Sequence, residues 1–393
     1  MKHRPLSQLK TSDLQSLMQS LQNSNGADRA ERFRINRVAT ALGIPELGAS
    51  YSLSVSATAE KVACEQNFYE FVKRAFQVVE PGTPFIGNWH IEAICNHLDA
   101  MFLGTIKNLI INIPPGTMKS FLMSILFPAW VWLHDPTQCF MFASYDQQLS
   151  TRDSIRCRQL ISSTWYRQNW GDVFYLVGDQ NEKTKFMNNR SGWRIATSTG
   201  GRGMGEHPHW LMVDDANNTR KQGSELDRLA VTEQWWDGAM SSRGRMLAGH
   251  HRLVTQQRVH PGDLTGHILK KHGGDYLHLK EPGEWWHLRL PMEYEEELHC
   301  DTLIFSDPRK GNEGMLLWPE AFPRELVDAI KIEMGPINTA GQLQQRPTVP
   351  GGTLFRGEWL KVVEPFPDQY LEGIFGDSSR EVIEHYQIGV GDG

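Results

Sequence analysis

Residues 107–120 read KNLIINIPPGTMKS, and this stretch decides the fold. An apolar run ends in a Pro/Gly turn that closes with Lys119 and Ser120, and a helix-like apolar segment follows at once. This order predicts a buried strand, a phosphate-binding loop and a helix, which together form a P-loop. Lys119 would reach the β- and γ-phosphates of a nucleotide, and the Ser120 hydroxyl would be a ligand of Mg²⁺. Ile113 and Met118 replace the two glycines of the standard motif, so the loop alone does not settle the interpretation.

The composition is that of a soluble globular protein. The 393 residues are 40% hydrophobic and 22% charged, with a formal net charge of −6. That charge excludes a uniformly basic nucleic-acid coat but not a local basic channel. The five cysteines are scattered without a C-x-x-C pair, which indicates neither a zinc site nor a disulfide framework. The N-terminus has no apolar signal region, and the most apolar stretch, 121–133, is short and interrupted by Pro128, so we expect a protein of the cytoplasm without a membrane span.

Four regions follow from the patterns along the chain. Residues 1–60 predict a helical N-terminal region that ends in a Ser/Ala-rich linker. Over 61–300 short apolar runs alternate with helical or loop segments, and fully apolar runs suit strands buried on both faces. We therefore expect an α/β fold there, a P-loop NTPase of the ASCE type with a mostly parallel sheet flanked by helices. Residues 301–350 predict a small lid or linker subdomain with a helix at 324–335, and 351–393 begin a further domain.

The second motif is HWLMVDD at residues 209–215, where an apolar strand ends in two adjacent carboxylates. A Walker B strand has this form. Asp214 would then hold Mg²⁺ through water, and Asp215 would be the catalytic base that positions the attacking water. The alternative is a surface turn after a strand, because Asp favours turns. The position downstream of a P-loop favours the Walker B interpretation.

A third apolar strand ends in polar residues, in RLVTQQRVH at residues 252–260. In P-loop motors a polar residue at the end of the neighbouring strand senses the γ-phosphate and couples hydrolysis to movement. Thr255 and Gln256 occupy that place, and we expect Thr255 to take part in catalysis in this way. The alternative is a hydrogen-bond cluster at the sheet edge.

These three motifs, in this order, resemble the large subunit of tailed-phage terminases, the ATP-driven motors of DNA packaging. The resemblance covers most of residues 64–360. A Walker A motif of the form Pro-Pro-(Arg or Gly)-x-(Gly or Met)-Lys-Ser is common in that family, and residues 114–120 match it. The resemblance implies that the loop binds ATP through Pro115, Gly116, Thr117, Met118, Lys119 and Ser120. It also implies an adenine-side role for Trp89 and His90, for which the alternative is a packing pair at the N-terminus of a helix.

The resemblance further implies an arginine that acts on the nucleotide of a neighbouring subunit. Some terminases carry this arginine finger on a Gly-rich loop before Walker B, which here is residues 198–203 with Arg202. Others carry it in Walker A, at the position that Gly116 holds here. The glycine at this position favours Arg202, and its rivals are Arg152, Arg156 and Arg158. The alternative is that Arg202 contacts a DNA phosphate or a surface carboxylate.

The resemblance implies an enzyme that hydrolyses ATP with Mg²⁺ and moves double-stranded DNA into a procapsid in the bacterial host cytoplasm. Its partners would be DNA, bound through phosphates without sequence preference, the portal protein and the terminase small subunit. It would work as a homo-oligomeric ring. The alternatives are an inactive prophage remnant that only assembles or binds DNA, and a helicase-like P-loop ATPase.

Terminase large subunits also have an RNase H-like nuclease domain that cuts DNA with metal-binding carboxylates. The candidate for the first of these carboxylates is Asp377, and only sixteen residues follow it. A nuclease needs several more strands and carboxylates. We therefore expect a chain truncated before or at the start of that domain, without nuclease activity.

Overall fold

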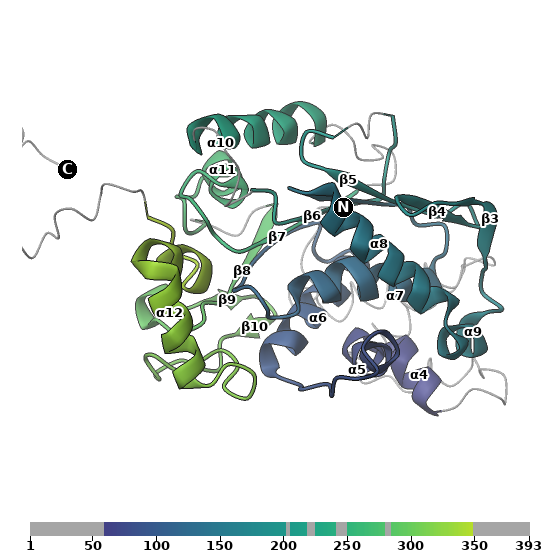
Figure 1. Ribbon diagram of the computed structural model, residues 1–393, viewed down its shortest axis with the longest axis horizontal. Coiled ribbons are helices and arrows are strands. Elements are labelled where there is room, and N and C mark those ends of the chain that lie inside the picture. The colour runs from purple at the N-terminus through teal and green to yellow at the C-terminus, as the bar shows by residue number, and fades with distance from the viewer. Residues whose placement is uncertain (1–58, 202–204, 218–224, 241–249, 280–283, 349–393) are drawn as a thin grey trace, which may run out of the picture. The chain divides into compact units, whose positions relative to one another are not determined.

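The computed structural model describes residues 59–348, apart from 202–204, 218–224, 241–249 and 280–283 (Figure 1). The chain divides into two compact units, Met1–Thr348 and Val349–Gly393, and all described residues belong to the first. Nearly all of the predicted N-terminal region, and the predicted start of a nuclease domain with Asp377, lie outside the described residues. The domain boundaries expected from the sequence stay predictions.

The described part of the chain is built on an eight-stranded sheet with the order β3-β4-β5-β2-β6-β7-β1-β8. The strands are β1 (Asn108–Asn112), β2 (Phe140–Ser144), β3 (Leu176–Asn181), β4 (Lys185–Asn188), β5 (Trp193–Ser198), β6 (Trp210–Asp214), β7 (His251–Gln256) and β8 (Trp285–Arg289). Six neighbouring strands of the sheet, β5, β2, β6, β7, β1 and β8, run parallel to one another. Strand β4 runs antiparallel to both of its neighbours, β3 and β5. The predicted α/β fold with a mostly parallel sheet is confirmed.

One strand separates the two strands that carry the predicted nucleotide motifs. β7 pairs with β1 on one side, where Asn112 lies opposite Gln256, and with β6 on the other, where Asp214 lies opposite Thr255. This interposed strand is the ASCE arrangement expected from the sequence. Because β1, β6 and β7 are parallel, their carboxyl ends meet at one edge of the sheet, where α/β proteins bind their ligands.

Helices cover both faces of the sheet (Figure 1). One face packs against α4 (Ala59–Gln66), α5 (Phe68–Val79), α6 (Trp89–Phe102), η2 (Phe121–Leu126), α7 (Phe127–His134), α8 (Gln147–Ser162) and α9 (Thr164–Trp170). The other packs against η3 (Trp235–Met240) and α11 (Leu264–Lys271), with α10 (Glu225–Gln234) against them. Strand β1 contributes Leu109 and Ile111 to the first core and Ile110 to the second. The apolar run before the P-loop is therefore a strand buried on both faces.

The helical segment after the P-loop accommodates Pro128. This residue lies in the first turn of α7 and lacks the N–H that would bond the carbonyl of Ser124, four residues earlier. Arg194 of β5 donates to that carbonyl instead, with an Nη2–O distance of 3.0 Å. The proline thus leaves no backbone acceptor unsatisfied, and it ties the helix to the sheet.

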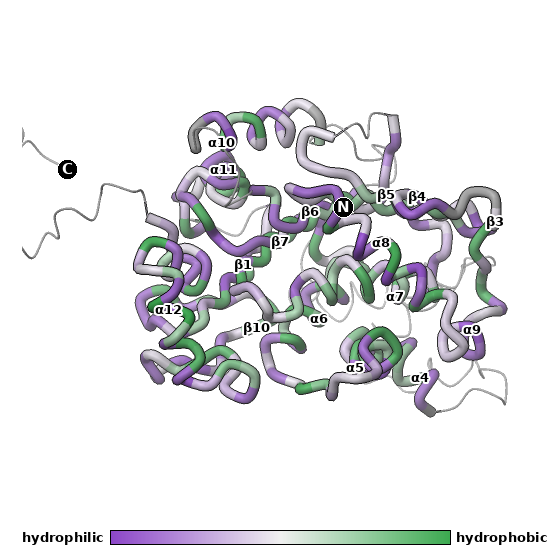
Figure 2. The backbone as a smooth tube through the Cα atoms, viewed as in Figure 1, coloured by the Kyte–Doolittle hydropathy of each residue, from purple (hydrophilic) through white to green (hydrophobic). Residues whose placement is uncertain are grey.

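Helix α5 shows the amphipathic pattern of a surface helix. Figure 2 shows both hydrophobic and hydrophilic residues around it. Its buried residues recur at intervals of three and four, and they are Phe68, Phe71, Val72, Ala75 and Phe76. Asn67 caps the helix by accepting a hydrogen bond from the N–H of Glu70.

The segment after β8 contains η4 (Glu296–Leu298), the hairpin of β9 (Asp301–Thr302) and β10 (Phe305–Ser306), α12 (Arg324–Asn338) and η5 (Thr339–Leu343). Helix α12 begins at Arg324 as predicted, and its helical conformation breaks at Gly335, which has a φ of 71° and is followed by Pro336. The chain bends at this Gly-Pro pair and resumes its helical course. Within the described ranges, none of the helices has the length and apolar character that crossing a bilayer requires.

Candidate nucleotide site at one edge of the sheet

The loop after β1 contains two residues with positive φ, Gly116 at 79° and Met118 at 67°. The Thr117 hydroxyl donates to the carbonyl of Pro114 at 2.7 Å and closes the turn. Met118 stands where the standard motif has glycine, and its backbone adopts the left-handed conformation that glycine normally supplies there. A left-handed conformation costs a residue with a side chain about 1–2 kcal/mol. The loop therefore stores strain at the position that departs from the motif.

Gly116 lies against the lid segment. A Cβ at this position would lie 3.0 Å from Cζ of Phe322, and its positive φ already disfavours any side chain. The arginine that some terminases carry here would therefore be strained and would displace the Phe322 ring.

Lys119 contacts the second carboxylate of the predicted Walker B motif. Its Nζ lies 2.7 Å from Oδ2 of Asp215, and 8% of the lysine and 20% of the aspartate side chain are exposed. Burial by itself lowers the pKa of the Lys119 ammonium, but the charges of Asp215 and Asp214 outweigh it and raise this pKa above its ordinary value. The loop therefore presents a charged lysine at the end of β6.

Asp214, the last residue of β6, is half-buried. Burial raises its pKa to about 6, while the nearby Lys119 charge and a hydrogen bond with the Ser120 side chain act in the opposite direction. The turn after β6 therefore brings both acids to the P-loop, Asp215 to Lys119 and Asp214 to Ser120.

Asp215 is held in an unusual conformation by its neighbours. Its φ is 46°, a value that costs about 1–3 kcal/mol and occurs most often at functional sites. Its N–H donates to the carbonyl of Thr255 at 2.9 Å, and its carbonyl accepts from the N–H of Tyr145 at 3.0 Å. Its Oδ1 accepts from the N–H of Gln257 at 3.1 Å. Sequence reasoning missed Gln257, because a backbone donor leaves no signal in the residue type.

Thr255 and Gln256 lie on opposite faces of the sheet, because side chains alternate along a strand. The Thr255 hydroxyl lies 2.9 Å from Oδ1 of Asp214 and 2.6 Å from the sulfur of Met123. It has one proton to donate, and the carboxylate is the stronger acceptor. The Gln256 amide is buried without a partner among the described residues. Of the two residues expected at the γ-phosphate, Thr255 lies with the carboxylates and Gln256 does not.

The oxygen atoms at this edge fit Mg²⁺. The ion prefers oxygen ligands and keeps several waters, so one or two protein groups beside a nucleotide phosphate suffice. The Ser120 hydroxyl and the Asp214 carboxylate are neighbours and supply two such oxygens. Among the described residues no cluster of three or more His, Cys, Asp or Glu side chains is arranged to hold a metal by itself.

The candidate arginine fingers are only partly described. Arg202 lies outside the described residues, and its role stays a prediction. Its three rivals lie on α8. Arg152 donates from Nε to Asp153 at 2.8 Å, and its pKa is raised by this bond and, more weakly, by the charge of Asp214. Arg156 forms an ion pair with Glu80.

Trp89 and His90 begin α6 beside the lid segment. The Trp89 ring stacks on Phe305 with centroids 5.9 Å apart, and the Arg309 guanidinium lies 5.1 Å from its centre. Burial lowers the pKa of His90 to about 3, although a hydrogen bond with the Thr117 backbone acts in the opposite direction. His90 is therefore a neutral imidazole next to the P-loop. The stacking favours the packing alternative for Trp89, and the adenine-side role stays a prediction.

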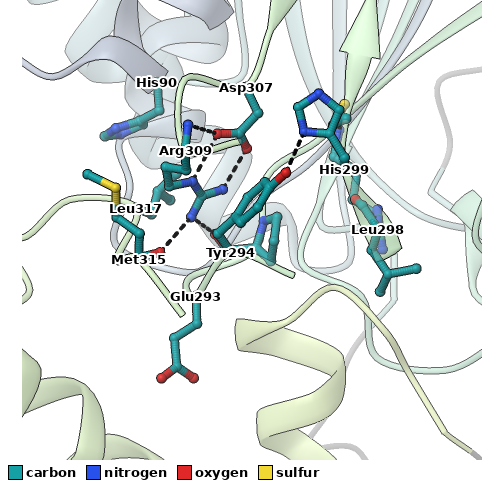
Figure 3. Close-up of polar contacts among 12 residues, drawn as sticks. His90, Glu293, Tyr294, Leu298, His299, Asp307, Arg309, Met315 and Leu317 are labelled. Carbon is teal, nitrogen blue, oxygen red and sulfur yellow. Dashed lines mark hydrogen bonds and ion pairs between the residues drawn. The ribbon is translucent and has the colours of Figure 1, made fainter. Parts of the chain in front are cut away.

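Sequence reasoning also missed the buried Arg309. Its Nε and Nη2 donate to Asp307 at 3.0 and 2.8 Å, and its Nη1 donates to the carbonyls of Pro291 at 2.9 Å and Met315 at 3.3 Å (Figure 3). This guanidinium therefore joins three parts of the segment after β8 beneath Trp89. An Asp-x-Arg sequence in a turn-rich stretch is equally typical of an exposed pair, so its burial was not predictable.

No family model and no curated protein matches the chain. Solved structures do resemble it. The HK97 bacteriophage large terminase is 13% identical with a TM-score of 0.46, and the match covers 71% of this chain and 54% of that one. A variant of the ATPase domain of a Thermus phage large terminase is 9% identical with a TM-score of 0.45, over 70% of this chain and 98% of that one. A large terminase of a thermophilic bacteriophage, solved in complex with ADP, is 8% identical with a TM-score of 0.38, and the match covers 69% of this chain and 52% of that one.

All three of these solved proteins are phage large terminases. They are also the family that the sequence motifs predicted. The chain spans about half the length of the HK97 terminase and of the ADP-bound terminase. The likeness is remote, and it concerns the course of the chain and not the residues of the site.

Proposed function

We propose that this chain is the ATP-hydrolysing motor of viral DNA packaging, the ATPase portion of a terminase large subunit. The observation that carries the hydrolytic part is the 2.7 Å contact between Lys119 of the P-loop and Asp215 after β6. Two motifs almost a hundred residues apart in sequence meet there, with Asp214 and Thr255 beside them. A surface turn after a strand would not bury a lysine against its carboxylates.

The residues divide the chemistry of phosphoryl transfer among them. Lys119 binds the β- and γ-phosphates and releases Asp215, which then accepts a proton from the attacking water. Ser120 and Asp214 would hold Mg²⁺, which would supply positive charge to neutralise the phosphates. Thr255 orients the Asp214 carboxylate through its hydroxyl. The backbone N–H groups of residues 116–118 stabilise the phosphate oxygens.

The DNA-packaging part of the proposal is supported by the order of the motifs. The partners are double-stranded DNA, contacted through its phosphates, the portal protein and the terminase small subunit. The active form is a homo-oligomeric ring, in which Arg202 of one subunit stabilises the transition state at the site of the next. A packaging motor has to accept any sequence, which phosphate contacts allow.

Phosphate release by the full chain, with and without blunt double-stranded DNA, tests this proposal. We expect Mg²⁺-dependent hydrolysis that DNA of unrelated sequences stimulates equally, with a stimulation that weakens as salt is raised. Asp215→Asn should abolish turnover, and Asp172→Asn, at an exposed aspartate, should not. DNA binding without hydrolysis would contradict the motor and favour the inactive remnant. Stimulation by single strands alone would favour the helicase-like alternative.

A further inference from the structure

A segment outside the nucleotide site holds the turn that follows β7. Oε1 of Gln345, just beyond η5, accepts from the N–H of Arg258 at 3.0 Å. Nε2 of Gln345 donates to the carbonyl of Gln342 at 2.5 Å, and the side chain is fully buried. Gln345 also has a φ of 53°. Both ends of its amide are engaged, so its side chain has a single orientation.

A second contact from the same segment reaches the same residue. A Cβ on Gly341 of η5 would lie 2.9 Å from the carbonyl oxygen of Arg258. Its φ is not in the left-handed region, so the glycine is required by close approach and not by conformation. Gln345 therefore binds the N–H of Arg258, and Gly341 packs closely against the carbonyl of the same residue.

Arg258 is fixed from its side chain as well. Its Nε lies 3.0 and 2.9 Å from the two carboxylate oxygens of Asp263, and both side chains are fully buried. Asp263 is the N-cap of α11 and accepts from the N–H of Gly266. The turn between β7 and α11 is thus held by α11 on one side and by the segment after α12 on the other.

This turn carries the backbone donor that meets Asp215. The N–H of Gln257 lies 3.1 Å from Oδ1 of Asp215, one residue before Arg258. The peptide groups that carry the N–H donors of Gln257 and Arg258 are planar and share the Cα of Gln257. Only the φ and ψ rotations of Gln257 separate these two groups, so a displaced Arg258 peptide moves the Gln257 N–H with it unless those rotations compensate. Gln345 thus acts on Asp215 through two adjacent peptide groups.

We propose that Gln345 is a positioning residue for Asp215. It holds the Arg258 backbone so that the Gln257 N–H fixes the direction of the Asp215 carboxylate. This inference rests on the proposed function, in which Lys119 leaves Asp215 for the nucleotide. The Gln257 N–H then remains as a donor that keeps Oδ2 aimed at the attacking water.

Two substitutions at position 345 separate positioning from stability. Gln345→Met keeps the length of the side chain and removes the acceptor, whereas Gln345→Glu keeps an acceptor for the Arg258 N–H. Gln344→Met is the matched control, because Gln344 is also buried but bonds Glu293 and Glu295 within the segment after β8. For each variant of the full chain, kcat and KM for Mg²⁺–ATP are measured together with the midpoint of thermal unfolding.

We expect Gln345→Met to lower kcat about tenfold with KM within about twofold, since misdirecting a catalytic group affects the transition state and not ground-state binding. Gln345→Glu should retain kcat within about threefold. Gln344→Met should also retain kcat, even if it lowers the midpoint of thermal unfolding as much as Gln345→Met does. If Gln345→Met does not fold, Gly341→Ala decides, because its Cβ displaces the Arg258 carbonyl and should give the same loss of kcat at constant KM.

Two results would overturn the inference. One is a kcat for Gln345→Met, or for Gly341→Ala in its place, that equals that of the unmodified chain. The other is an equal loss of kcat in Gln344→Met. If Lys119→Ala loses turnover but Gln345→Met keeps it, this inference is overturned and the proposed function stands. Turnover that survives Lys119→Ala would overturn the proposed function and the inference with it.

Discussion

Thr255 and Asp214 are register partners on adjacent strands, and the Thr255 hydroxyl donates to Oδ1 of Asp214 at 2.9 Å. A donor to a buried carboxylate compensates part of its lost solvation. The same bond connects the strand that leads to Arg258 and α11 with the acid proposed to hold Mg²⁺. The end of β7 is therefore attached to both carboxylates at the end of β6, to Asp214 by a side chain and to Asp215 by backbone.

Replacing Thr255 by Val removes the hydroxyl and nearly conserves the shape of the side chain. We expect kcat for ATP hydrolysis to fall about 10- to 100-fold, because a hydrogen bond to a charged group contributes about 1.5–3 kcal/mol. Nucleotide affinity should change less than about threefold, since Lys119 and the loop are intact. Phosphate release and fluorescent-nucleotide binding measure the two effects. Thr255→Ser, which keeps the hydroxyl, should retain most of the rate, and equal losses in both variants would argue against a role for the bond.

Gly116→Ala should destabilise the P-loop more than Gly104→Ala destabilises its own turn. Both glycines have a φ of 79°, so both variants incur about 1–2 kcal/mol of backbone strain. Only at Gly116 does the added Cβ meet another group, Cζ of Phe322 at 3.0 Å, whereas nothing lies within 4 Å at Gly104. Overpacking of this kind costs about 1 kcal/mol or more. Urea unfolding measures the difference between the two variants in the free energy of unfolding. This difference should shrink when Phe322→Leu is combined with Gly116→Ala. Equal losses of unfolding free energy in Gly116→Ala and Gly104→Ala would show that the contact with Phe322 is unimportant.

His97 makes stability depend on pH. It is fully buried between α6 and β9, with Nδ1 2.7 Å from the carbonyl of Ala93 and Nε2 2.9 Å from the Thr302 hydroxyl, and burial lowers its pKa to about 4. The unfolded chain, with a histidine pKa of about 6.5, binds the proton first. This contribution is therefore intact above pH 6.5 and is lost as pH falls from 6.5 to 4, by up to about 3 kcal/mol.

Unfolding free energies measured between pH 7 and pH 4 check this dependence. His97→Gln should flatten the slope, and His207→Gln, at an exposed histidine, should leave it unchanged. A slope that is the same in His97→Gln as in the unmodified chain would contradict the assignment.

Much of the fold was predictable because the central strands are apolar runs that end in polar motifs. The sequence predicted the strand before Lys119, the strand before Asp214 and the polar end of the strand at Thr255. These predictions follow from local pattern, since a strand buried on both faces has few other sequences available to it. The helix at 324–335 was predicted at both ends, because the Gly335-Pro336 pair breaks the helical conformation where the sequence places the stop.

The contacts that complete the site were not predictable. The ASCE arrangement predicts that β7 lies between β1 and β6, but it does not predict which side chains pair at the edge of the sheet, such as Lys119 with Asp215. The positive φ of Asp215 is imposed by backbone bonds to Thr255 and Tyr145. The backbone donor of Gln257 has no residue type to reveal it. Sequence patterns report burial and chemistry, whereas these features depend on how distant backbone segments meet.

The central claim is that Lys119 binds the nucleotide phosphates in a hydrolytic site, and its most direct test is the steady-state rate of phosphate release from Mg²⁺–ATP by Lys119→Ala. The matched control is Lys73→Ala on α5, where the lysine forms a surface ion pair with Glu70 at 2.6 Å. We expect Lys119→Ala to lower the rate by about 100-fold or more, and Lys73→Ala to retain it within about twofold. A rate for Lys119→Ala equal to that of the unmodified chain would contradict the claim.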